Sequence, residues 1–191
     1  QVVKDHVKYG ASSSSRSTLT PAFFVNVYPF ESKLLAVRAF AKKSFRMPTF
    51  NDLYYADMGN SKLNPESALQ SDLGFVLNKD WKQGIVDHFR LQVDGYYNTV
   101  YDKIVADRKG QQFRWTMLNL GKVHIKGVDA MAEVGLEPAK DWKVTARLQY
   151  TYQDARDVTD PNTSYYKDQI PYIPWHSGSA ILGLSWRELD L

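Results

Sequence analysis

Two linked motifs decide the fold of this chain: SFRMPTFNDLYY at residues 44–55 and NSKLNPE at residues 60–66. Apolar and polar side chains alternate on both sides of these motifs, over residues 34–42 and residues 69–78. Alternation of this length is typical of a β-strand with two unlike faces. The motifs are therefore predicted to lie in a connection between two long strands.

Proline and turn-forming residues indicate that this connection is a loop. Pro48 has no N–H to donate to a strand ladder, and Pro65 restricts the residue before it to extended backbone. Gly59 and Asn60 are residue types that turns favour. We therefore expect a long polar loop over residues 46–66, with aromatic side chains near its start.

The same alternation recurs along the rest of the chain. Residues 88–98 show it most clearly, with polar or tyrosine side chains at every second position and an almost wholly apolar set between them. Residues 142–153 and 180–186 follow the same pattern. Because a shift of one residue would exchange the two faces, the register must keep the apolar set on one side of a single sheet. The residues expected on that side include Phe89, Leu91, Val93, Val144, Ala146, Leu148, Leu182 and Leu184.

The predicted connections alternate in length. Gly121 and Gly127 suggest bends or bulges within one long strand. Alternation of long loops with short turns is typical of outer-membrane barrels, in which all long loops lie at one end. The sequence thus predicts an all-β chain, an antiparallel up-and-down meander of about seven or eight long strands. Long loops are expected over residues 8–19, 46–66 and 155–176, short turns over 28–32, 79–85 and 137–141, and a moderate connection over 106–112.

The composition excludes several classes of site and partner. The chain has 191 residues and no Cys, so it has no disulfide framework and no Cys-based metal site. A net charge of +3 with mixed signs does not argue for nucleic acid as a partner. No apolar run approaches the ~20 residues of a membrane helix. The 12 Tyr and 5 Trp suit the aromatic girdles of a barrel, although a soluble sandwich can also be rich in Tyr.

Residues with catalytic or metal-binding potential are scattered. The histidines show no i, i+4 pairing, and the run Ser12–Ser15 lacks the G-x-S-x-G nucleophile elbow. Carboxylates in or beside one loop could hold Ca²⁺, but their spacing matches no known calcium loop, and solvated carboxylates are the alternative. The sequence therefore predicts no enzyme, no cofactor and no metal site. The residues weighed were His6, His88, His124, His176, Asp154, Asp157, Asp160 and Asp168.

The motifs together resemble the barrel of TonB-dependent outer-membrane receptors. The order F-R-x-P-T-F-x-D-L-Y, then G-N-x-x-L-x-P-E, then an alternating strand is similar to a segment in the second half of that barrel. Residues 119–129 resemble a later strand of the family, with Asp129 where the family usually has Glu. The residues that carry the resemblance, and to which it assigns a structural role, are Arg46, Pro48, Leu53, Tyr54, Asn60, Leu63, Pro65, Glu66, Asn119, Gly121, Gly127, Pro171 and Pro174.

The resemblance implies a part of a transmembrane barrel of about 22 strands in the bacterial outer membrane. Residues 1–191 would form a partial barrel domain, without the plug domain and the terminal strands. The implied partners are membrane lipid, a small-molecule solute and, in the full-length protein, the plug and the TonB complex. The solute would be an iron chelate, haem, cobalamin or a similar compound. Tyr54, Tyr55, Arg114 and Trp115 are candidates for contact with it, with girdle anchoring as the alternative role.

The polar face can be interpreted in two ways. Arg38, Arg90, Gln92, Arg147 and Gln149 would line the lumen of a barrel, or face solvent on a one-sided sheet. A soluble β-rich module that binds carbohydrate or protein is therefore the alternative to a receptor, and a barrel enzyme is a third possibility. If the receptor interpretation holds, unpaired strand edges and an uncovered apolar face should make the isolated chain self-associate.

Overall fold

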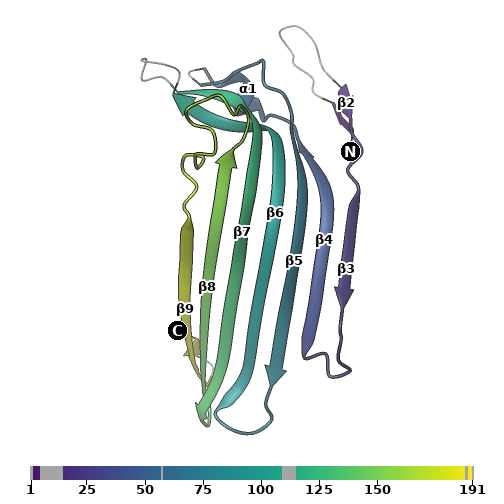
Figure 1. Ribbon diagram of the computed structural model, residues 1–191. Helices are drawn as coiled ribbons and strands as arrows, with labels where there is room; N and C mark the ends of the chain where they lie inside the picture. The colour runs from purple at the N-terminus through teal and green to yellow at the C-terminus, as the bar shows by residue number, and fades with distance from the viewer. Residues whose placement is uncertain (1, 5–14, 57, 109–114, 188, 191) are drawn as a thin grey trace.

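The computed structural model describes residues 2–4, 15–56, 58–108, 115–187 and 189–190 (Figure 1). Within these residues, eight strands form one antiparallel sheet in chain order from β3 to β10, and two short strands form a separate pair. The predicted antiparallel meander is thus confirmed, with β10 as a two-residue addition. The strands are β1 (Val2–Lys4), β2 (Ser15–Ser17), β3 (Ala22–Val27), β4 (Leu35–Arg46), β5 (Glu66–Asp80), β6 (Val86–Arg108), β7 (Trp115–Ala139), β8 (Trp142–Asp157), β9 (His176–Trp186) and β10 (Leu189–Asp190).

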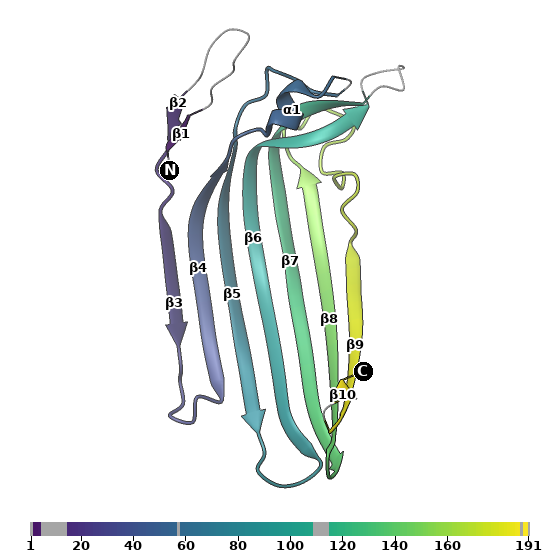
Figure 2. The same cartoon turned by 180° about the vertical axis from the view of Figure 1, so that it is seen from behind.

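The connections lie at the two ends of the sheet according to their length. Residues 47–65 and 158–175 connect strands at one end, and residues 28–34, 81–85 and 140–141 form turns at the other (Figures 1 and 2). The predicted alternation of long loops and short turns is confirmed for these connections. We refer below to the loop end and the turn end of the sheet.

Two predicted connections fall partly outside the described residues. A moderate connection was expected over residues 106–112, but β6 continues to Arg108, so residues 106–108 belong to the strand. Residues 109–114 lie outside the described part of the chain. The first long loop was expected over residues 8–19, but Ser15–Ser17 pairs with Val2–Lys4 as a strand.

A short helix, α1 (Phe50–Tyr54), interrupts the loop predicted over residues 46–66. The Thr49 hydroxyl accepts a hydrogen bond from the Asp52 N–H, and the Asp52 carboxylate accepts one from the Thr49 N–H. This capping box satisfies donors that the first turn of a helix leaves free. The prediction of an irregular loop was therefore wrong for these five residues. No helix among the described residues is long and apolar enough to cross a membrane.

The register of the sheet places the apolar side chains on one face. Phe89 lies opposite Val134, which lies opposite Ala146, which lies opposite Leu182. Leu91 and Leu148 both lie opposite Ala132, so they share the same face as predicted. This face is uncovered, and Leu73, Leu148 and Leu182 are 63%, 60% and 73% exposed.

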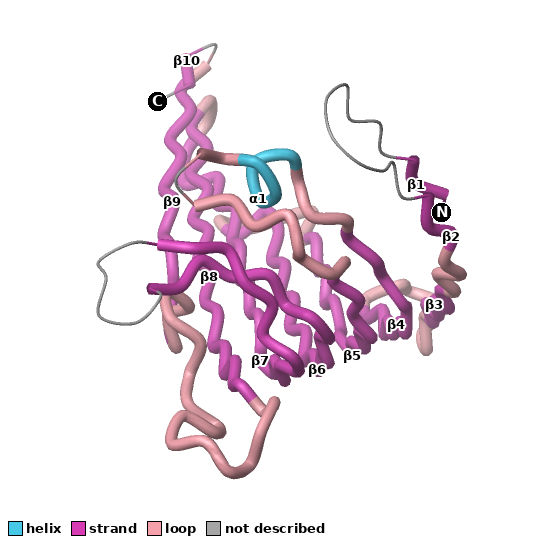
Figure 3. The backbone as a smooth tube through the Cα atoms, turned by 90° about the horizontal axis from the view of Figure 1, so that it is seen from above, coloured by secondary structure: helices cyan, strands magenta, loops and turns pink. Residues whose placement is uncertain are grey.

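The alternate positions, among them Arg38 and Asp94, lie on the opposite face. Helix α1 lies on the concave side of the curved sheet (Figure 3), and its Asp52 contacts Arg46, which is on the same face as Arg38. Arg38 and Asp94 lie on either side of Gly74 in the ladder. The Arg38 guanidinium donates from Nε to Asp94 Oδ1 at 2.9 Å and from Nη2 to Asp94 Oδ2 at 2.7 Å. Gln92 Nε2 donates to the same carboxylate at 2.9 Å. Because Gly74 has no side chain, the ion pair passes directly over β5.

Of the bends or bulges predicted at Gly121 and Gly127, the bulges are absent. The register is continuous past both residues, and the shifts fall between Val86 and His88 and between Leu136 and Ala139. A Cβ on Gly127 would lie 2.5 Å from the Tyr96 hydroxyl, and a Cβ on Gly121 would lie 2.5 Å from Thr159 Cγ2. Both glycines therefore serve close packing across strands rather than a change of register.

Most of the buried apolar side chains gather near the loop end. Ala68, Val100, Val123 and Ala155 pack together with Ile170, which belongs to the connection between β8 and β9. The Ile170 N–H donates to the Ala155 carbonyl at 2.9 Å. This connection therefore folds back against β8 and completes a small core at the loop end.

We predict that the Gly74→Val variant lowers the free energy of unfolding by about 2 kcal/mol, the usual contribution of hydrogen bonds to a charged group. A Cβ at this position would lie 1.9 Å from Asp94 Oδ1 and would displace the carboxylate from Arg38. Urea unfolding of the intact protein in detergent micelles measures the change. Gly95→Ala is the matched control, since its Cβ would meet only the Leu73 carbonyl oxygen, at 3.8 Å. Equal stability of the two variants would contradict this prediction.

We also expect the isolated chain to self-associate in buffer without detergent. The strands β3 and β10 are the edges of the sheet, and each edge presents unpaired backbone groups. On the uncovered apolar face, Leu73, Leu148 and Leu182 are each more than half exposed, and soluble monomers rarely tolerate apolar patches above a few hundred Å². Light scattering measures the mass of the particles, and a monodisperse monomer would show that the apolar face is covered within the chain.

Candidate functional site

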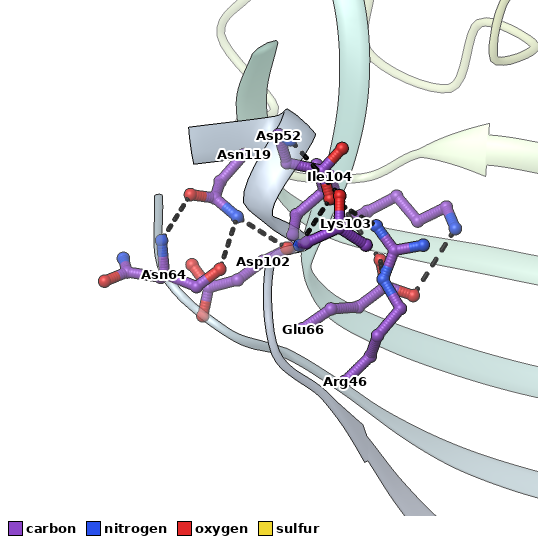
Figure 4. Close-up of polar contacts among 9 residues, drawn as sticks. Arg46, Asp52, Asn64, Glu66, Asp102, Lys103, Ile104 and Asn119 are labelled. Atoms are coloured by element: carbon purple, nitrogen blue, oxygen red, sulfur yellow. Dashed lines mark hydrogen bonds and ion pairs between the residues drawn. The ribbon is translucent and has the colours of Figure 1, made fainter. Parts of the chain in front are cut away.

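A carboxylate at the start of β5 anchors the loop end to the neighbouring strand. Glu66 Oε2 accepts a hydrogen bond from the Ile104 N–H at 3.2 Å, and Glu66 Oε1 lies 3.4 Å from Lys103 Nζ (Figure 4). Arg46 Nε lies 4.0 Å from Glu66 Oε2, and Arg46 Nη2 lies 3.6 Å from Asp52 Oδ2. The end of β4, helix α1 and the beginning of β5 are thus linked to β6 by charged groups.

Asparagine side chains link the same loop to β7. The Asn64 N–H donates to Asn119 Oδ1 at 2.8 Å, and Asn119 Nδ2 donates to the Asn64 carbonyl at 3.0 Å and to the Asp102 carbonyl at 2.8 Å (Figure 4). Asn60 Nδ2 donates to the Met117 carbonyl at 2.9 Å. Four of the residues that carried the family resemblance, Arg46, Asn60, Glu66 and Asn119, therefore take part in these contacts. We call this set of contacts the loop bracket; its residues are Arg46, Asp52, Asn60, Asn64, Glu66, Asp102, Lys103, Ile104, Met117 and Asn119.

Apolar and proline residues of the same motifs flank the bracket. Leu63 is buried, and Leu53 belongs to α1. Pro48 lies two residues after the end of β4, and Pro65 directly precedes the first residue of β5. Both prolines thus lie just outside a strand, where the N–H that proline lacks is not needed for the ladder.

A groove of about 740 Å³ lies between the ends of β6 and β7 and the connection over residues 158–175. Its volume is within the range of pockets that hold small organic molecules. Tyr165 and Tyr172 line it, and Tyr172 is 80% exposed. Asp168 adds a carboxylate, and Val105, Leu118, Leu120 and Ile170 supply apolar surface. Pro171 is also part of the lining, whereas Pro174 is not.

The candidate aromatic residues do not form one cluster. The Tyr54 ring lies 5.1 Å from the Phe50 ring within α1, and Tyr55 is exposed at the C-cap of that helix. The Trp115 ring lies 5.9 Å from the ring of Tyr172 and so borders the groove. Arg114 lies outside the described residues. Of the candidates that the structure describes, only Trp115 contacts a residue of the groove lining.

Sequence reasoning missed Tyr165, Tyr172 and Asp168 as a group around one groove. The tyrosines were visible as part of a Tyr-containing loop, but nothing local indicated that this loop folds back on β8. The prolines on either side of Tyr172 favour a compact loop, and they are the one local feature that could have indicated these residues as a group.

The loop carboxylates have partners within the protein. Asp154 lies 2.7 Å from Arg156 Nε and 3.5 Å from Lys126 Nζ. Asp157 accepts a hydrogen bond from the Thr159 N–H, and Asp160 accepts one from the Asn162 N–H. Among the described residues, no group of three or more His, Cys, Asp or Glu side chains is placed to hold a metal ion.

Comparisons with known proteins agree with this arrangement. A family model described as "TonB dependent receptor-like, beta-barrel" matches residues 3–191. The vitamin B12 transporter BtuB of Vibrio vulnificus (strain YJ016) is 28% identical over 118 residues, which are 61% of this chain and 17% of that protein. The copper transporter OprC has a similar fold, with a TM-score of 0.62 and 21% identity, over 92% of this chain and 25% of that protein.

The chain therefore spans a quarter or less of the length of these two relatives. The family model, in contrast, covers almost the whole chain, and its β-barrel description agrees with the antiparallel meander and its exposed apolar face. The chain belongs to the TonB-dependent receptor β-barrel family.

Proposed function

We propose that this chain is part of the wall of an outer-membrane receptor that takes up a bulky organic solute, such as a metal chelate or a corrinoid. The observation that carries the proposal is the division of one sheet into an exposed apolar face and a hydrogen-bonded polar face. The apolar face would contact lipid, and the concave polar face would line the lumen. Family membership is at odds with the alternative of a soluble binding module.

Aromatic belts at both ends of the apolar face support this placement. Trp142 and Trp186 stack at the turn end with ring centroids 5.9 Å apart, and Tyr152 stacks on Trp175 near the loop end at 6.2 Å. The distance from Trp142 to Tyr152 along β8 is about 33 Å at ~3.3 Å per residue. With a strand tilt of about 40°, the belts are about 25 Å apart in height, which matches the apolar band of outer-membrane barrels.

The groove at the loop end supports an organic solute. Its apolar lining, the exposed rings of Tyr165 and Tyr172 and the half-buried ring of Trp115 offer flat surfaces for a large planar or ring-containing compound. Tyr54 and Tyr55 would contribute from α1 if the bound solute extends that far. Coupling to the plug and the TonB complex would require the intact receptor, because this chain spans only part of its relatives.

Cysteine labelling tests the proposed orientation. The chain contains no Cys, so Lys62→Cys at the loop end and Lys82→Cys at the turn end would be unique reactive sites within it. In the full-length receptor on intact cells, a membrane-impermeant maleimide should label the variant at residue 62 alone. Residue 82 should react only after the outer membrane is permeabilised. Labelling of both variants on intact cells, or only of the second, would contradict the orientation.

A tyrosine substitution tests the solute groove. We expect Tyr172→Ala in the full-length receptor to weaken solute binding about 10-fold, since an aromatic contact contributes about 1–1.5 kcal/mol. Equilibrium binding of cyanocobalamin, haem and a ferric siderophore would identify the solute that the wild-type receptor accepts and measure the loss. Tyr28→Ala is the control, because Tyr28 is also exposed but lies in a turn-end connection. Equal affinities of the Tyr172 variant and the wild type would exclude the groove as a binding site.

A further inference from the structure

We propose that the apolar face carries a defined site for one anionic lipid, with an acyl chain in a depression around Gly95 and a phosphate headgroup at Lys126. The inference rests on the proposed function, because that function places this face in the bilayer. It goes beyond general contact with lipid, because it names one position on the wall and one headgroup chemistry.

The depression results from the absence of a side chain in the middle of β6. Gly95 lies opposite Leu73 on one side and opposite Val128 on the other. The side chains around it enclose a shallow hollow of about 500 Å³. A hollow that is apolar and faces a bilayer is complementary to a hydrocarbon chain. The residues of its apolar-face rim are Ser71, Leu73, Tyr97, Lys126, Val128 and Tyr152.

Three cationic side chains lie on the same face on the loop-end side of the hollow. Lys126 belongs to the rim and is 62% exposed in its side chain. Arg156 is joined to it through Asp154, whose carboxylate lies 3.5 Å from Lys126 Nζ and 2.7 Å from Arg156 Nε. Lys122 Nζ lies 5.7 Å from the centroid of the Tyr101 ring. Asp154 and Asp168 both act on Arg156, and two carboxylates cannot neutralise three cations, so the cluster retains positive charge for an anion.

The cluster lies at the depth where lipid headgroups are expected. Tyr152 stacks on Trp175, and the Arg156 guanidinium lies 5.5 Å from the centroid of the same Trp175 ring. Tyr and Trp side chains mark the boundary between hydrocarbon and headgroups. The cations are therefore at or just beyond that boundary, and the hollow is on its hydrocarbon side. A free phosphate ion would use only the cations, whereas a phosphorylated lipid fills both parts.

Lipid titration of the full-length receptor tests the charged half of the site. Native mass spectrometry would measure binding of phosphatidylglycerol and of phosphatidylcholine with identical chains. We expect one phosphatidylglycerol to bind preferentially, and the Lys122→Gln/Lys126→Gln variant to bind it about 30-fold more weakly, at roughly five-fold for each lysine near an anionic lipid. Lys79→Gln is the control, because Lys79 lies beside an aromatic ring, as Lys122 does, but at the turn end. Glycerol phosphate, which has no chains, should not compete.

A second variant tests the hollow without changing any charge. Gly95→Val should fill it and weaken phosphatidylglycerol binding, and the strand should tolerate the change because the nearest atom to a new Cβ is 3.8 Å away. Equal binding by the wild type and either the lysine variant or the Gly95 variant would overturn the lipid site, as would displacement of the lipid by glycerol phosphate. Insertion of the same proteins into phosphatidylcholine vesicles tests the proposed function separately. A receptor that inserts but shows no preference for phosphatidylglycerol would contradict the lipid site alone.

Discussion

The antiparallel register from β4 to β8, which shifts near the turn end and is otherwise continuous, controls what this chain presents to its surroundings. Along the continuous part, residues are paired with defined partners on the next strand, so the positions of one face stay together across the sheet. A slip of one residue between two strands would send Leu91 to the polar face and Asp94 to the apolar one. The two faces, and with them the proposed lipid and lumen surfaces, exist only because this register is kept.

Glycines determine where long side chains can reach across the sheet. Gly74 allows Arg38 to pass over β5 to Asp94, and Gly127 makes room for the Tyr96 ring. On the apolar face, Gly95 has the opposite effect, since no neighbouring side chain fills its place. The same residue type therefore supports dense polar packing on one face and a hollow on the other.

The loop bracket gives the loop end a fixed framework. Its hydrogen bonds join residues 55 positions apart in the chain, such as Asn64 and Asn119, and so hold the segment after α1 against β7. The connection after β8 is held separately by Ile170. The groove between these elements is thus bordered by strands and by an anchored loop, and such support limits the cost of ordering a site when a solute binds.

The sequence by itself determined the strands, the sharing of faces and the alternation of long and short connections, because a period of two is a local property of the chain. It also contained the capping signal of α1, Thr49 followed by Asp52, which the interpretation as a loop overlooked. Only the tertiary structure decided that Gly121 and Gly127 serve packing, and that Trp115 meets Tyr172 at a groove. These contacts join residues distant in the chain, and local patterns carry no information about which distant side chains will meet.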